Sequence, residues 1–159
     1  MLAQTLAALA DFPRQLEAHV AAVPPGMLRW TPGDWAGCPS ERLTVVEQLW
    51  HLRDIEIDGY HVRFPRTLEE THPLLADIDG EALAVQRCHG ERDPHQALRE
   101  FKQARAQTVA LLQSLDADAF ERTARFDGGT ITLRGLVHML CSHDHQHLAG
   151  LQWLLARHS

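Results

Sequence analysis

Four segments of the chain repeat apolar side chains at steps of three and four residues, and this periodicity limits the fold more than any other feature of the sequence. Each segment is about 20 residues long, the length of a helix that crosses a small domain. Between the segments we find no convincing pair of strands. The sequence therefore predicts an all-α fold, a four-helix bundle.

Proline, glycine and capping residues give the expected ends of the first two helices. The first segment covers residues 2–23 and stops at the Pro-Pro-Gly run that follows it. Pro13 lies inside this segment, so we expect a kinked or restarted helix. Thr44 and Glu47 have the spacing of a capping box and begin the second helix, which we expect Pro65 to end.

The second half of the chain begins with an irregular connection over residues 66–92, in which we expect at most one short helix. Asp93 and Pro94 begin the third helix, FDGGTIT forms a turn, and Thr132 caps a final helix over about residues 133–157. The long connection between the second and third helices is typical of a crossover. With 159 residues and no repeat, the chain 1–159 is expected to form a single domain.

The charge and cysteine content argue against several classes of protein. A net charge of −6 lacks the basic surplus that binds nucleic acid, and no apolar run approaches the roughly 20 residues that span a membrane. We therefore expect neither nucleic acid nor a membrane as a partner. Three cysteines without a CxxC pair predict reduced thiols instead of a disulfide framework or a cysteine zinc site. Cytoplasmic localisation is the resulting expectation.

Histidine is the unusual component, with 11 residues in the chain, and three of them alternate within CSHDHQHLAG at 141–150. His143 and His147 continue the apolar stripe of the last helix and lie one turn apart on the same face. His145 is turned about 200° away, and His138 also points elsewhere. Two imidazoles at this spacing are typical of ligands that share one divalent ion.

A third ligand has to come from a facing helix, and the second helix offers His51 on the edge of its apolar side, near Ile55 and Val62. Three neutral imidazoles with open positions are the pattern of a catalytic metal. The ordinary alternative for His51 alone is a hydrogen-bonded core histidine, and His143 with His147 alone leaves both interpretations open.

At these residues the chain resembles the DinB-like superfamily, which includes DinB and YfiT-like proteins. The resemblance covers nearly the whole chain and is carried by LRWTPGDW, VVEQLWHLRDIE, ALREFKQARAQTVALLQSL and TLRGLVHMLCSHDHQHLAGLQWLL, in that order. It implies a four-helix bundle, often dimeric, with a divalent ion held by one histidine of the second helix and two of the last. Those positions are His51, His143 and His147.

The resemblance also draws attention to two acids and one arginine. The family has acids three and five residues after the first histidine, which are Asp54 and Glu56 here. Asp54 is expected to orient an imidazole or a bound water, with a solvated acid as the alternative. Arg105 of the third helix is a candidate contact for an anionic substrate, although a pairing with a surface acid is the commoner role of such an arginine.

The family hosts several chemistries, so the resemblance implies a class of function and not one reaction. We expect a metal-dependent enzyme, a thiol S-transferase or a hydrolase, in which the ion activates a thiol or a water for attack on a small-molecule substrate. Zinc or nickel is the expected ion, with iron or manganese also suited, and a low-molecular-weight thiol is a possible co-substrate. The alternative is a non-catalytic, stress-associated metal-binding protein whose ion braces the bundle.

A homodimer is expected on the resemblance and on the apolar side of the second helix. That helix carries Val46, Trp50, Ile57 and Phe64 besides the residues that face its own core. This is more apolar surface than one face requires.

Overall fold

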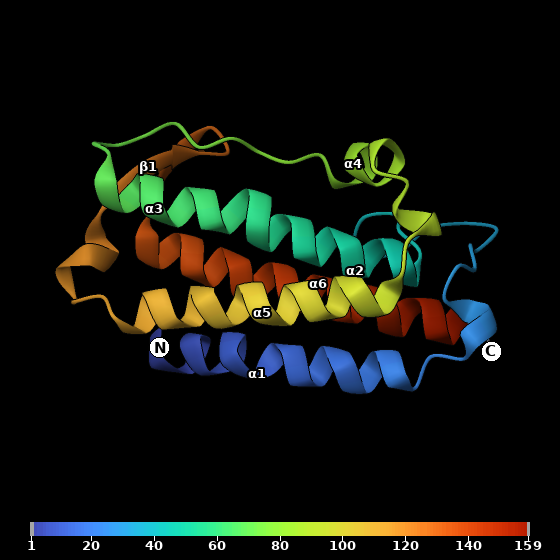
Figure 1. Cartoon of the computed structure of the whole chain (residues 1–159). Coiled ribbons are helices and arrows are strands. Elements are labelled where there is room, and N and C mark those ends of the chain that lie inside the picture. The colour runs from blue at the N-terminus through green and yellow to red at the C-terminus, as the bar shows by residue number, and fades with distance from the viewer. Residues whose placement is uncertain (1, 159) are drawn as a thin grey trace.

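The computed structural model describes residues 2–158, and four long helical rods pack side by side in it (Figure 1). The first rod contacts the third and the fourth, and the N-terminal half of the second rod also contacts both of them. The predicted four-helix bundle is thus confirmed. The rods are α1 (Leu2–Ala21), the continuous run of α2 (Val45–Asp54), η2 (Ile55–Tyr60) and α3 (His61–Glu69), then α5 (Pro94–Gln113), and α6 (Leu133–His158).

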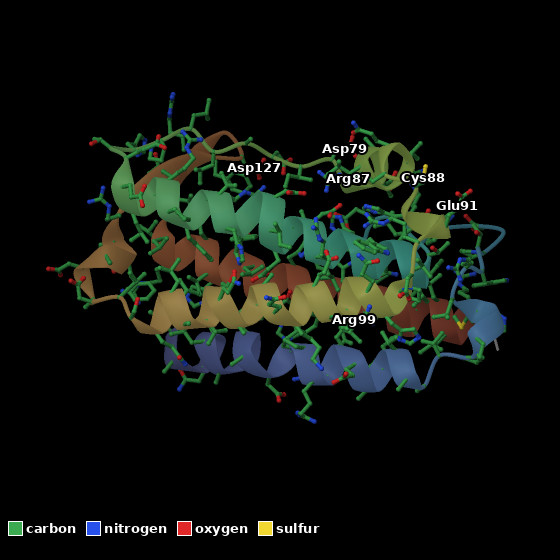
Figure 2. The ribbon with its side chains drawn as sticks, in the orientation of Figure 1. Asp79, Arg87, Cys88, Glu91, Arg99 and Asp127 are labelled. Carbon is green, nitrogen blue, oxygen red and sulfur yellow. The ribbon has the colours of Figure 1, made fainter. Side chains whose placement is uncertain are left out.

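The order of the rods explains the long connection between the second and third of them. In Figure 1, α1 and α6 run in one direction, whereas the α2–α3 rod and α5 run in the other. The chain must therefore return along the whole bundle between α3 and α5, as a crossover does. This connection contains α4 (Gly80–Gln86), which Asp79 caps, and η3 (His89–Glu91), and both contact α2 (Figures 1 and 2).

Pro13 does not restart α1, so that part of the prediction is wrong. The helix runs unbroken from Leu2 to Ala21. A proline lacks the N–H that would bond to the carbonyl four residues earlier, here that of Leu9. Nη1 of Arg105 donates to this carbonyl oxygen at 3.2 Å instead, and so the lost backbone bond is replaced from α5.

Pro65 does not end the second rod either, since α3 continues to Glu69. The turn before α3, η2, is π-helical and adds a residue to the helical turn, which rotates all later side chains relative to α2. As a result Tyr60 and Phe64 are buried, whereas Val62, which the regular periodicity placed on the apolar side, is 48% exposed.

A two-stranded hairpin, β1 (Thr123–Phe126) and β2 (Gly129–Thr132), replaces the expected simple turn between the last two rods. Its two turn residues, Asp127 and Gly128, both have positive φ, as the tight hairpin turn requires. The crossover pairs with the outer side of β1, where the amide of Leu75 donates to the carbonyl of Arg125 at 2.9 Å. These strands have only four residues each, which is too short for alternation to reveal them.

The apolar side of the second rod is already used inside one molecule. Val46, Trp50 and Phe64 are fully buried in the monomer, and only Ile57 of the four residues keeps partial exposure. The argument for a dimer from spare apolar surface is therefore wrong. No helix within residues 2–158 combines the length and the apolar character that a membrane crossing requires.

Candidate metal centre

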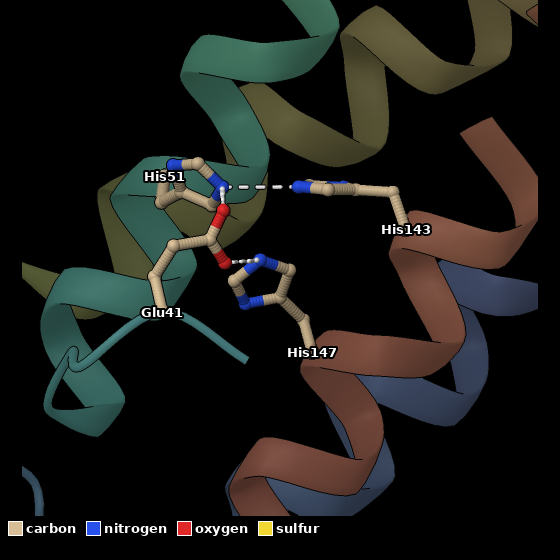
Figure 3. Close-up of side chains that lie close together, drawn as sticks. All are labelled: Glu41, His51, His143 and His147. Carbon is tan, nitrogen blue, oxygen red and sulfur yellow. Dashed lines mark hydrogen bonds and ion pairs between the residues drawn. The ribbon is translucent and has the colours of Figure 1, made fainter. Parts of the chain in front are cut away.

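The three predicted histidines lie together between α2 and α6, with their rings directed at one point (Figure 3). Nε2 of His51 is 3.0 Å from Nε2 of His143. The ring centroid of His147 lies 4.6 Å from that of His51 and 4.5 Å from that of His143. The structure thus brings together the residues that the sequence predicted for one site.

A carboxylate that the sequence analysis missed completes the group. Glu41 lies in the loop before α2, and its Oε2 is 2.9 Å from Nε2 of His147 while its Oε1 is 3.6 Å from Nε2 of His51. One donor atom from each of the four side chains lies within 4.8 Å of the others. Glu41 stands three residues before Thr44, and this closeness to a helix cap was its only sequence signal.

The capping box that begins α2 also fixes the loop from which Glu41 projects. The amide of Glu47 donates to the Thr44 hydroxyl at 3.3 Å, and the amide of Thr44 donates to the Glu47 carboxylate at 2.8 Å. These bonds hold the entry of the chain into α2. The cap therefore sets both Glu41, on the loop, and His51, two turns into the helix.

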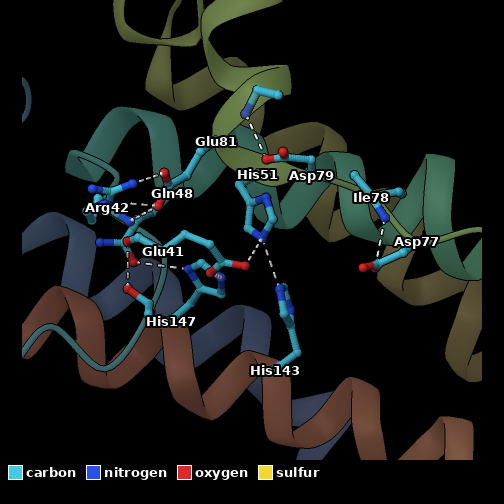
Figure 4. A network of polar contacts seen from close by, with 12 residues as sticks. Glu41, Arg42, Gln48, His51, Asp77, Ile78, Asp79, Glu81, His143 and His147 are labelled. Atoms are coloured by element: carbon cyan, nitrogen blue, oxygen red, sulfur yellow. Dashed lines mark hydrogen bonds and ion pairs between the residues drawn. The ribbon is translucent and has the colours of Figure 1, made fainter. Parts of the chain in front are cut away.

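A buried amide orients His147. Gln48 donates from its Nε2 to the carbonyl of Leu43 at 3.2 Å, so its Oε1 is the atom that faces Nδ1 of His147, also at 3.2 Å (Figure 4). Since an amide oxygen only accepts, the proton of His147 belongs on Nδ1. The lone pair of Nε2 is then directed into the cluster, as metal ligation requires.

Two glycines allow the surrounding chain to approach the cluster. A Cβ at Gly80, the first residue of α4, would overlap with the ring of His51. A Cβ at Gly150 of α6 would overlap with the Ser40 hydroxyl and lie 3.1 Å from Oε1 of Gln48. The absence of side chains at both positions lets the crossover cover one face of the cluster and the loop before α2 cover another.

Burial keeps His51 and His143 neutral at pH 7. Desolvation is the largest cause of the low pKa of His51, about 3, and it also places the pKa of His143 well below its ordinary value. The approach of His147 lowers the pKa of Glu41. His51 and His143 therefore present uncharged nitrogen lone pairs beside an ionised carboxylate, which is the protonation state that binds a divalent cation.

The arrangement of the donors fits such an ion. Two imidazole nitrogens bound tetrahedrally at 2.0–2.1 Å lie about 3.3 Å apart, close to the 3.0 Å between His51 and His143. Nε2 of His147 is buried and makes no aligned hydrogen bond, although an oxygen of Glu41 lies 2.9 Å away. A bound cation would satisfy that nitrogen, to which the described residues offer only the Glu41 oxygen.

The cluster opens on one side to a cavity of about 210 Å³. Glu41 and His143 are the members of the cluster that line it, and Ser142 and Gln146 of α6 add polar groups. The remaining walls are largely apolar or aromatic and come from the second rod, the crossover, β1 and α6: Ile55, Tyr60, Ile78, Phe126 and Met139. A small molecule in this space would lie directly against the cluster.

Asp54, expected to orient an imidazole of the site or a water, does face an imidazole, but not one of the cluster. Its Oδ2 lies 3.1 Å from Nε2 of His89, in the crossover. Its Oδ1 lies 3.0 Å from guanidinium nitrogens of both Arg53 and Arg87. The carboxylate is completely buried and ties the crossover to α2, so its position supports a structural role.

Arg105, expected as a substrate contact, is only 1% exposed and is committed to the protein itself. Its Nη2 lies 2.8 Å from the carboxylate of Glu56, and its Nη1 lies 2.7 Å from that of Asp144. It therefore cannot reach the cavity, and the placement of Arg105 at a substrate is corrected. The two acids belong to η2 and α6, so the sequence around Arg105 did not indicate them.

His138 and His145, which were expected outside the ligand set, do lie outside it, and so does His61. His61 faces the carbonyl of Ala104 at 3.0 Å, and His138 faces the Thr5 hydroxyl at 2.9 Å. His145 is exposed, as its position on the opposite side of α6 predicted.

Comparison with known proteins agrees with this description. Residues 8–151 match the family model of the DinB superfamily. Among solved structures, the chain is similar to YfiT from Bacillus subtilis, described as a probable metal-dependent hydrolase with an unusual four-helix bundle topology. The two chains are 25% identical and superpose with a TM-score of 0.86 over 98% of this chain and 86% of YfiT. No curated protein matches. The family match spans most of the sequence, and the chain therefore belongs to the DinB superfamily.

Proposed function

We propose that this protein is a metal-dependent hydrolase whose ion is held by His51, His143 and His147, with Glu41 as a fourth donor. The observation that carries the proposal is the opening of this donor group onto a cavity, since a catalytic ion needs room for a substrate beside its ligands. The description of YfiT as a probable metal-dependent hydrolase favours hydrolysis.

A divalent ion in this donor set supplies Lewis acidity, which polarises a substrate carbonyl and lowers the pKa of a water or thiol. The residues of the chain would hold the ion and orient its ligands. Gln48 keeps the Nδ1 proton of His147 away from the cluster. Glu41 brings a negative charge to the edge of the cavity, where it offsets part of the cationic charge and can accept a hydrogen bond from a nucleophile.

Thiol S-transfer remains a second candidate for the same site. The superfamily resemblance supports it, and the cavity borders the cluster closely enough for a small thiol to take the place of water. Water is the nucleophile in hydrolysis and a thiol in S-transfer, so one experiment that supplies a substrate for each reaction distinguishes them.

A non-catalytic, bracing ion is the alternative that Glu41 favours. Structural zinc sites usually have four protein ligands, and Glu41 with the three histidines makes four. Against this, the Glu41 side chain is 36% exposed and comes from a loop, unlike a ligand fixed within the core. We therefore regard the carboxylate as a ligand that substrate can displace.

The test uses protein loaded with zinc or nickel, analysed for metal content and assayed with 4-nitrophenyl acetate and with small thiols plus 1-chloro-2,4-dinitrobenzene. We expect metal-dependent turnover that His147→Ala abolishes while circular dichroism shows a folded bundle. His145→Ala, an exposed histidine two residues earlier, is the matched control and should retain both ion and turnover.

Two outcomes would contradict the proposal. A folded His147→Ala variant that loses its ion but keeps full turnover would show that the ion is not the catalyst. A fully loaded wild-type protein with neither activity, and with a higher melting temperature than the metal-free form, would support the bracing ion.

We also propose that the protein forms a homodimer, on the superfamily resemblance alone. Light scattering that gives the monomer mass of 17.9 kDa across micromolar concentrations would exclude it.

A further inference from the structure

The cavity beside the candidate metal centre has one permanently cationic residue in its lining, Arg63 of α3. We propose that Arg63 binds a carboxylate group of the substrate, so that the protein acts on small acids whose reacting carbonyl lies at the cluster. This inference rests on the proposed function for the reacting end of the molecule. The binding of the carboxylate is argued separately.

The guanidinium of Arg63 is held in a fixed position. It is only 5% exposed and stacks on two aromatic rings, with its central carbon 5.0 Å from the ring centroid of Tyr60 and 4.5 Å from that of Phe126. Its Nε and Nη2 donate to the carbonyl of Ala76 in the crossover, at 3.3 and 3.0 Å. A guanidinium has five N–H donors, so this single carbonyl oxygen does not exhaust them. The fork is thus preorganised to receive a further acceptor at little cost in side-chain entropy.

The carboxylate nearest to Arg63 is poorly suited to be its permanent partner. Asp77 Oδ1 lies 3.8 Å from Nη2, beyond hydrogen-bond distance, and the Asp77 side chain is 88% exposed. Exposed ion pairs of this kind contribute little. A ligand carboxylate that enters the cavity can form bidentate, desolvated bonds that Asp77 does not form, and so it can displace that acid.

The rest of the lining sets the size of the molecule. Ile55, Ile78 and Met139 contribute hydrocarbon walls to this small cavity of about 210 Å³. That volume suits an acid with a few carbon atoms. One end would contact Arg63, and the other would lie near His143, which lines the same cavity.

Calorimetry with succinate tests the binding directly. We expect Arg63→Gln to weaken succinate binding about 10- to 100-fold, because a charged hydrogen-bond donor is lost. Asp77→Asn should strengthen binding about 2- to 5-fold, because a competing carboxylate is removed. Asp118→Asn makes the same change in charge at an exposed site outside the cavity and should have no effect.

Arg63→Gln and Asp77→Asn together distinguish a loss of the binding site from a folding defect. Arg63 also holds the crossover, so circular dichroism must show that Arg63→Gln is folded, and Asp77→Asn changes only an exposed side chain. Unchanged succinate affinity in a folded Arg63→Gln variant, or equal affinity in Asp77→Asn and Asp118→Asn, would overturn the proposal.

A pair of esters separates this inference from the proposed function. The loaded protein should hydrolyse mono-4-nitrophenyl succinate with a higher kcat/KM than 4-nitrophenyl acetate, and Arg63→Gln should remove that preference. If neither ester reacts while succinate binding still depends on Arg63, the hydrolase proposal fails and the carboxylate site stands. If both esters react equally well in wild type and Arg63→Gln, and succinate affinity is also unchanged, the carboxylate site fails alone.

Discussion

Two of the buried polar clusters differ in how their groups are paired, and adjacent residues of α6 belong to each of them. His143 joins the candidate metal centre, whereas Asp144 joins Arg105 and Glu56. In the second cluster each guanidinium nitrogen of Arg105 has a protein acceptor. In the first, Nε2 of His147, which faces the cluster, is buried without an aligned hydrogen bond.

The difference indicates two separate tasks. Charges that are paired on all sides gain little from a ligand and lose much when one partner is removed. Buried lone pairs without partners carry a desolvation cost that a bound cation can relieve. We therefore expect the Arg105 cluster to determine whether the bundle folds, and the histidine cluster to determine what it binds.

The largest expected effect follows from breaking the closed cluster. Arg105→Met leaves two buried carboxylates without their cation and should lower the free energy of unfolding by about 3–5 kcal/mol. His147→Ala should lower that of the metal-free protein by only about 1–3 kcal/mol. Urea unfolding measures both, and Arg99→Met, at an exposed arginine, is the control. Equal losses at Arg105 and His147 would remove the distinction between the clusters.

A fall in pH should change the free energy of unfolding in opposite directions through the two clusters. From pH 7 to 5 the unfolded chain protonates its histidines, while His51 with a pKa of about 3 stays neutral in the native state, and so does His143. The unfolded state then binds more protons, and each histidine costs about 2 kcal/mol of stability. Burial raises the pKa of Asp144 to about 6, so its native-state protonation returns about 1 kcal/mol over this range. Metal-free protein should therefore lose stability in urea titrations as the pH falls, and a flat profile would contradict the burial of neutral imidazoles.

Crowding the face of His51 should weaken metal binding while the closed cluster remains intact. Gly80→Ala forces the new methyl group against the His51 ring, and we expect about 10- to 100-fold weaker zinc binding in competition with a chelating dye. Gly129→Ala is the matched control, because a Cβ there meets nothing within 4 Å. Unaltered zinc affinity in a folded Gly80→Ala variant would show that this close approach does not position the ligand.

The smallest effect concerns the orientation of one imidazole. Gln48→Met removes the acceptor for Nδ1 of His147, and we expect about 10-fold weaker zinc binding, since outer partners of ligands contribute about that much. Gln113→Met, at an exposed position of α5, supplies the comparison. If both variants bind zinc like the wild type, the histidine is oriented by packing alone.

The helical parts of the fold could be predicted because local periodicity encodes them. The stripe through His143 and His147 on α6 placed both residues correctly, and the capping box at Thr44 marked the start of α2 within one residue. Pro13 and Pro65 do not interrupt the helices that contain them, since the loss of one backbone donor is a local cost that packing offsets. The π-helical turn η2 has no comparable signal, and it shifted Val62 out of the apolar side.

Parts of the site escaped prediction where they depend on contacts between distant segments. Glu41 projects from a loop, where no periodicity tells the direction of a side chain. The spacing of Asp54 from His51 was a valid reason to bring them together, but His89 and Arg87 of the crossover hold the carboxylate instead. Local sequence patterns do not predict where that crossover packs against α2.

The centre joins residues that are remote along the chain, and this has a consequence for the folding kinetics. His51 and His143 are separated by 92 residues, and Gln48 and His147 by 99. Such high-contact-order pairs close only after the entropy of long loops has been lost, so the site should form late on the folding pathway. An ion that binds there would then slow unfolding far more than it accelerates folding, and removal of the ion would shorten the lifetime of the native state.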